Sequence, residues 1–146
     1  MRHLLTNRQH GIPFWAIVLL VKHSGYRSPT EGELKWQVSN LLAYGARGIG
    51  YFTYWTPDPD PAMNWQPAVI GSDGKRTAWY DVLAAWNPQV MAAGEALASQ
   101  TWLLTVHAGS VPVGGMAFTP DAWVQSVEGR AALGYFSDAS GRFHLL

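Results

Sequence analysis

The chain has 146 residues, no net formal charge at pH 7 and 14% charged residues, against roughly 25% in typical soluble domains. It is long enough for one domain with a core. Because it has no basic stripe, we do not expect nucleic acid as a partner. The longest apolar run, residues 12–21, contains Pro13 and is far shorter than the about 20 residues of a membrane helix, so no membrane span is expected. The absence of cysteine excludes disulfides and thiolate metal sites and leaves the cellular compartment open.

The first half of the chain predicts a strand, a helix and a second strand. Residues 1–11 are expected to be a loop or the tail of a helix, and Phe14–Val21 (FWAIVLLV) has the composition of a buried strand. Two overlapping capping boxes, at residues 28–31 and 30–33, predict the start of a helix, with Pro29 suited to its first position. Apolar residues at helical spacing follow, and Gly45 is expected to end the helix in a left-handed conformation.

The second strand is expected at residues 49–55 (IGYFTYW), before Thr56 and Pro57. Two strands that are apolar on both faces suit a parallel sheet covered on both sides. The order therefore predicts a βαβ unit with a right-handed crossover. Alternation places Ile49, Tyr51, Thr53 and Trp55 on one face of this strand.

A proline-rich loop at residues 56–75 separates this unit from a second helix. Loops of this length in a compact domain are usually functional, and residues 72–75 carry a turn signal. Apolar spacing predicts a helix over residues 77–99, with Asn87 and Pro88 expected to kink or restart it. Short apolar runs then predict strands near residues 102–107, 123–127, 133–137 and 142–146, with a hairpin loop at residues 138–141.

The segment PTEGELKWQVSNLLAYGARGIGYFTYW, residues 29–55, carries a resemblance to a known family. It is similar to the carboxyl-terminal part of clan-A glycoside hydrolases, especially β-galactosidase-like proteins grouped around family forty-two. The resemblance covers about residues 12–107 and rests on the aromatic-ended strand and the GARGI corner. It implies an α/β fold that is a partial (β/α)8 (TIM) barrel, the last two βα units in residues 1–100, followed by a β-rich segment of a sandwich in residues 101–146.

Two departures from that family bear on activity. A full barrel needs about 250 residues, so roughly six βα units are missing, among them the one that carries the family's acid/base. The family's nucleophile is a glutamate at the end of strand seven, whereas this chain reads Val21-Lys22-His23-Ser24 at the corresponding place. We therefore expect a fragment that is inactive alone, with no catalytic residue, cofactor or metal, and with exposed strand edges through which copies can pair.

The candidate residues are ones that could bind a sugar. Trp55 is either a stacking platform at the barrel mouth or a buried core residue, and Trp65 in the loop is the second candidate platform. Lys22 and His23 follow the first strand and can bond hydroxyl groups. Arg27 can hold a sugar or make a structural bond to the neighbouring loop. Asp58, with Asp60, is either a ligand contact or a solvated loop residue.

Two hypotheses for function follow from this sequence. The chain is either part of a β-galactosidase-like barrel that contributes a sugar-binding wall, or a non-catalytic carbohydrate-binding or structural module. Carbohydrate is the expected partner in the first case. Eight tryptophans, six tyrosines and five phenylalanines fit sugar stacking and core packing equally well.

Overall fold

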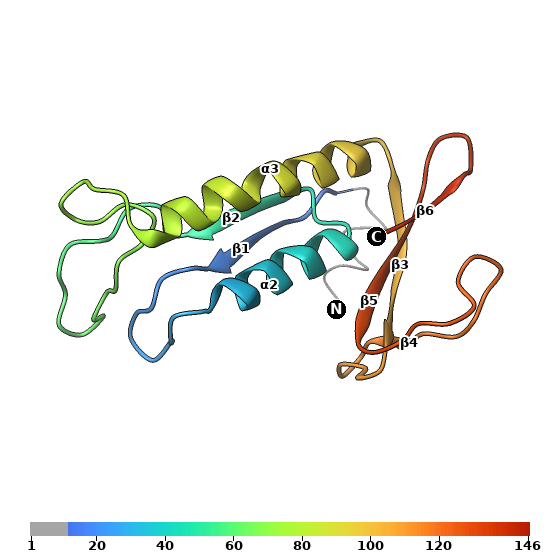
Figure 1. Cartoon of the computed structure of the whole chain (residues 1–146), viewed down its shortest axis with the longest axis horizontal. Coiled ribbons are helices and arrows are strands. Elements are labelled where there is room, and N and C mark those ends of the chain that lie inside the picture. Colours follow the sequence, from blue (N-terminus) through green and yellow to red (C-terminus); the bar gives the residue numbers. More distant parts are fainter. Residues whose placement is uncertain (1–11) are drawn as a thin grey trace. The chain divides into compact units, whose positions relative to one another are not determined.

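The computed structural model describes residues 12–146 and has a mixed α/β fold (Figure 1). What we expected of residues 1–11 lies outside the described part of the chain. The described residues form two compact units: residues 15–39 and 48–93 in one, and residues 12–14, 40–47 and 94–146 in the other. We call them the helix–strand unit and the β-rich unit. The domain boundary expected near residue 100 stays a prediction.

In the helix–strand unit, β1 (Trp15–Leu19) and β2 (Gly48–Phe52) pair in parallel, side by side in Figure 1. Helix α2 (Glu31–Ala43) connects them, which confirms the expected strand–helix–strand order and the parallel pairing. Both strands are shorter than expected. The second ends at Phe52, so the expected continuation to Trp55 is wrong.

The two faces of this sheet have different surroundings. Val18 is 2% exposed, and its register partner Tyr51 donates a hydrogen bond of 2.9 Å to Asn87 Oδ1 of α3 (Ala78–Ala98). This face therefore packs toward the helices. On the opposite face Trp15 and Ile17 are 78% and 77% exposed. The expectation of a sheet covered on both sides is wrong for the described residues.

Helix α2 begins with one of the two expected capping boxes. The Thr30 backbone N–H donates to Glu33 Oε2 (2.8 Å), and the Glu33 N–H donates to Thr30 Oγ1 (3.2 Å). Thr30 is thus the N-cap, and the helix begins at Glu31. Pro29 consequently precedes the cap and is not the first helical residue, and the box expected to start at Ser28 gives way to the one at Thr30.

Helix α2 ends as expected at Gly45, which has a φ of +79°. The Gly45 N–H donates to Leu42 O and the Ala46 N–H to Leu41 O, the paired bonds of a Schellman motif. In the β-rich unit this helix end is bonded to the sheet, since both Trp102 Nε1 (3.1 Å) and Thr105 Oγ1 (2.8 Å) donate to Ala43 O.

Helix α3 runs without a break through Pro88, so the expected restart with Asn87 as a cap is wrong. Pro88 removes one backbone donor and leaves the carbonyl of Ala84 without its usual partner. Both residues are exposed, so water can bond that carbonyl. Asn87 lies inside the helix, and its side chain accepts the bond from Tyr51.

The β-rich unit holds one four-stranded sheet in the order β4-β3-β5-β6. Its strands are β3 (Thr101–Ala108), β4 (Met116–Ala117), β5 (Ala131–Ser137) and β6 (Phe143–Leu145). β5 pairs antiparallel with β3 and β6, and the expected hairpin loop connects β5 to β6. The strand expected at residues 123–127 is absent, because the Asp121 carboxylate binds the backbone N–H groups of Trp123 and Val124 in a turn.

Candidate functional site

Four aromatic side chains meet where the two parallel strands end. Phe52 is the last residue of β2, and its carbonyl accepts hydrogen bonds from the N–H groups of Leu20 (2.8 Å) and Val21 (3.1 Å), just after β1. The His23 ring stacks on Trp65, with centroids 4.6 Å apart and planes 24° apart, and lies 5.4 Å from the Phe52 ring. Tyr26, Phe52 and Trp65 surround His23, and we call these four residues the carboxyl-edge cluster.

The proline-rich loop delivers Trp65 to this cluster through backbone bonds. The Gln66 N–H donates to Lys22 O (3.0 Å), and the Ser24 N–H donates to Met63 O. Ser24 adopts a left-handed φ of 50°, a conformation that side-chain-bearing residues rarely take. The loop is therefore bonded to the chain on both sides of His23, and the stacked pair is held by main-chain contacts.

The His23 ring has a defined polar orientation within the cluster. Its Nδ1 lies 3.2 Å from Val21 O. Because a carbonyl can only accept, Nδ1 is the donor in this contact. In the neutral ring Nε2 is then an acceptor, which suits the hydroxyl group of a ligand. The ring thus has an apolar face against Trp65 and a polar edge.

Trp65 also lines a cavity of about 470 Å³ beside the cluster. This volume lies in the range of small-molecule sites. Proline rings and polar groups of the turn at residues 71–76 share the lining, among them Ser72, Asp73 and Lys75. Asp73 Oδ1 accepts from the Lys75 N–H (3.0 Å), and this bond is the main cause that lowers the pKa of Asp73. The cavity therefore combines an indole wall with a charged rim.

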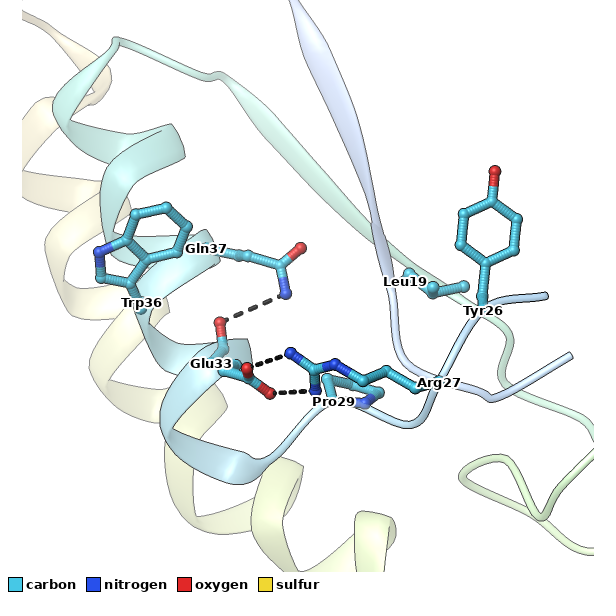
Figure 2. A pocket seen from close by; sticks show the side chains of 7 residues that line it. All are labelled: Leu19, Tyr26, Arg27, Pro29, Glu33, Trp36 and Gln37. Atoms are coloured by element: carbon cyan, nitrogen blue, oxygen red, sulfur yellow. Dashed lines mark hydrogen bonds and ion pairs between the residues drawn. The ribbon is translucent and has the colours of Figure 1, made fainter. Parts of the chain in front are cut away.

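Arg27 lies in a different environment (Figure 2). Its guanidinium pairs with the Glu33 carboxylate through two bonds, Nη1 to Oε2 at 2.8 Å and Nη2 to Oε1. The bonds from Arg27, with that from the Thr30 backbone, lower the pKa of Glu33 from 4.5 to about 2. The pair borders a pocket of about 310 Å³ that Leu19, Tyr26 and others also line. Arg27 thus stabilises the start of α2, and its pocket adjoins the carboxyl-edge cluster through Tyr26, which belongs to both.

Trp55 does not lie on the strand face where alternation placed it. β2 ends before it, and the face that carries Tyr51 meets α3, so that face does not line an open sheet surface. Trp55 instead forms an isolated parallel bridge with Ile70 and is 48% exposed, which makes it neither a strand residue nor a buried core residue. Its ring lies near Gly74 in the turn at residues 71–76.

The structure brings some of the candidate residues together and leaves others apart. His23 and Trp65 are in stacked contact, and Lys22 contributes its carbonyl to the loop bond. Asp58 is exposed in the loop. Sequence reasoning missed Tyr26 and Phe52 as neighbours of this stack. The available signal was that aromatic residues near the carboxyl ends of two parallel strands meet at one edge of a sheet.

The described residues contain no group of three metal-binding side chains that could hold an ion. Within the same residues, neither helix is both long and apolar enough to cross a membrane. No protein-family model, curated protein or solved structure matches this chain. The interpretation of function therefore depends on the geometry above and on the resemblance carried by residues 29–55.

Proposed function

We propose that this chain is part of a carbohydrate-active (β/α)8 barrel, similar to β-galactosidase-like glycoside hydrolases of clan A, and that it contributes a sugar-binding wall. In this proposal β1 and β2 are neighbouring barrel strands, α3 is the helix that follows the second of them, and the β-rich unit begins a sandwich. Other βα units supply the rest of the barrel.

The carboxyl-edge cluster is the observation that carries this proposal. Ligands of parallel α/β folds bind at the carboxyl ends of the strands, which is where His23, Phe52 and Trp65 meet. An indole face combined with hydroxyl-binding groups suits a sugar, whose ring has an apolar C–H face and a polar edge. The exposed Trp15 and Ile17 face agrees with the inner surface of a barrel, where further strands would cover it.

Several carboxylates of the helix–strand unit make structural bonds, which supports a binding role in preference to a catalytic one. Glycoside hydrolysis normally uses two carboxylates across the scissile bond. Glu33 is engaged by Arg27 and Thr30, and Glu31 pairs with Lys35. Asp60 bonds the Ala62 N–H. These engagements favour the second candidate, a non-catalytic carbohydrate-binding module, as the behaviour of this chain by itself.

The binding proposal is tested by titrating lactose into the full chain and following the protein by NMR. A sugar face stacked on indole removes about 50–80 Å² from water, or roughly 1–2 kcal/mol. We expect Trp65→Ala to weaken binding about 5- to 30-fold. Trp36→Ala, which removes an exposed tryptophan of α2, is the matched control and should leave the affinity unchanged.

The same titration decides whether Trp55 belongs to the site. If Trp55 contacts the sugar, Trp55→Ala should also weaken lactose binding, with little change in Tm. Lactose binding that is equal in the wild-type chain and Trp65→Ala, with both proteins folded by circular dichroism, would contradict the proposed site.

A separate assay tests the expected lack of activity, which both candidate functions share. We expect the purified chain to bind sugar without hydrolysing an aryl β-galactoside. Turnover above a blank that persists through repeated purification would assign a catalytic role to this chain. It would contradict the expectation that the chain lacks the family's acid/base residue.

A further inference from the structure

A second pair of aromatic rings lies exposed in the β-rich unit, outside the carboxyl-edge cluster. Trp123, in the segment between β4 and β5, and Phe143 of β6 have ring centroids 4.3 Å apart and planes inclined by 33°. Trp123 is 60% exposed and Phe143 is 48% exposed. Because the phenyl ring lies against one side of the indole, the exposed surface of Trp123 is mainly its other side.

The position of Trp123 is fixed by hydrogen bonds to one carboxylate. Asp121 Oδ1 accepts from the backbone N–H groups of Trp123 and Val124, both at 2.8 Å. Asp121 Oδ2 accepts from the Tyr135 hydroxyl at 2.7 Å, and Tyr135 is a buried residue of β5. The turn that presents the indole is thus bonded to the sheet, so its backbone has little conformational freedom left to lose on binding.

The exposed rings are a poor match for a protein interface. A stable interface buries about 800 Å² on each partner, whereas a whole aromatic side chain has only about 150–250 Å². Leu145 of β6 and the next residue, Leu146, are the exposed apolar residues that follow Phe143 in the chain. Val111, Val113 and Met116 are also exposed, but they lie in and before β4, at the opposite edge of the sheet. The patch around Trp123 and Phe143 is therefore small.

A small patch of this kind has polar residues beside it. Gln125 is exposed, and its Nε2 donates to the Asp121 carbonyl, next to the turn that holds Trp123. Arg142 precedes Phe143, but its Nε donates to Asp138 Oδ2, the oxygen that His144 Nε2 also contacts, so its guanidinium shares the His144 side of β6 and is engaged away from Phe143. The Gln125 amide beside an open indole face can bind a hydroxyl group of a sugar whose C–H face stacks on the ring.

We propose that Trp123, supported by Phe143, is a surface binding site for one pyranose ring of a neutral carbohydrate. This site is separate from the carboxyl-edge cluster and does not depend on a barrel. Phe143 and Asp121 act as positioning residues, because Phe143 contacts the indole and Asp121 binds the backbone of the turn that carries it, and neither is required to touch the sugar.

The test is a titration of the full chain, labelled with ¹⁵N in its indole groups, with cellobiose. The Trp123 resonance is assigned as the indole signal that disappears in Trp123→Phe. We expect this resonance to shift saturably with cellobiose. Trp123→Ala should weaken binding at this site about tenfold, the effect of one lost stacking contact, as measured by retention on a polysaccharide-containing gel.

Two further variants separate ring stacking from folding. Asp121→Asn keeps the indole but loses charge in the turn, and should weaken cellobiose binding severalfold while the Trp123 signal persists. Should Trp123→Ala unfold, Trp123→Phe replaces it, with a smaller loss expected. Trp65→Ala is the control that removes the other proposed site and should leave the Trp123 shift intact.

An indole resonance of Trp123 that does not move with cellobiose would overturn the proposal. So would equal retention of the wild-type chain and folded Trp123→Ala on the gel. A molecular mass that falls with dilution in the wild-type chain but not in Trp123→Ala would identify the patch as a contact between copies, and would also overturn it.

Discussion

At the scale of single residues, the start of α2 shows one carboxylate with several structural bonds. Glu33 accepts from Thr30 and from Arg27, so the same side chain caps the helix and anchors the loop that follows β1. A sequence with two overlapping capping boxes cannot reveal which one forms. Arg27 favours the capping box at Thr30, because Glu33 can accept hydrogen bonds from Arg27 and from the Thr30 backbone at the same time.

The pH dependence of stability should carry a contribution from Glu33. Its pKa is about 2 in the folded chain against an ordinary value of 4.5, so the folded state binds a proton less readily than the unfolded state. The contribution is therefore present above about pH 4.5 and is lost as pH falls toward about 2. We expect Glu33→Gln to reduce the fall in Tm between about pH 5 and pH 2.5.

Glu31→Gln is the matched control, since Glu31 lies on the same helix and pairs with Lys35. Asp121 and Asp138 also have lowered pKa values, mainly through bonds from Tyr135 and Ser140, and they too contribute to the pH dependence of stability. The Tm of each variant is therefore compared with that of the wild-type chain at the same pH. Parallel curves of Tm against pH for Glu33→Gln and the wild-type chain would exclude this role.

The residues of the candidate site were only partly predictable. His23 and Trp65 were recognisable as sugar-binding types, but their contact depends on how the loop at residues 56–75 folds. That loop has no periodic pattern, and its backbone bonds to Lys22 and Ser24 are not encoded by residue type. Trp55 was misplaced because alternation holds only while the strand continues, and β2 ends at Phe52.

At the scale of elements, the end of α2 packs closely against β5. A Cβ added to Gly134 would lie 2.3 Å from Ala43 O and 2.8 Å from Ala43 Cα. Both contacts are with backbone, which cannot rotate away. The absence of a side chain at Gly134 therefore permits the hydrogen bonds from Trp102 and Thr105 to the same carbonyl.

Two glycine-to-alanine substitutions should have opposite effects on stability. Gly134→Ala forces β5 and α2 apart, and we expect it to lower the free energy of unfolding by about 1–3 kcal/mol. Gly94→Ala, inside α3 and with nothing within 4 Å of the added Cβ, should raise it by up to about 1 kcal/mol. Urea denaturation measures both. A Gly134→Ala variant as stable as Gly94→Ala would contradict the close packing.

The helices and most strands were predictable because their signals are local. Apolar spacing located α2 and α3 within a residue or two, and the left-handed Gly45 marked the end of α2. The run at residues 123–127 resembles a strand in composition but is held in a turn by Asp121. Asp121 also accepts a hydrogen bond from Tyr135 of β5. A bond between residues of different elements cannot be predicted from local sequence patterns.

At the scale of the whole molecule, an apolar sheet face in the helix–strand unit is left open to solvent. Trp15 lies across Gly48, where an added Cβ would come within 2.3 Å of the indole, and Ile17 has Gly50 as its register partner. Large side chains thus alternate with glycines across the two strands. In the proposed barrel this face points inward, and additional parallel strands pair with the edges of β1 and β2.

Copies of this chain should therefore associate through the open face and the strand edges when no other βα units are present. Ile17→Lys places a charge on that face, where the side chain is 77% exposed, so folding should be little affected. We expect light scattering to show a mass that increases with concentration for the wild-type chain and stays monomeric for Ile17→Lys.

Met91→Lys, on the exposed side of α3 at 64% exposure, is the control and should associate as the wild-type chain does. A wild-type chain that stays monomeric at about 100 μM, well above the roughly micromolar Kd of a modest interface, would show that the open face is tolerated without a partner and would count against a barrel of more strands.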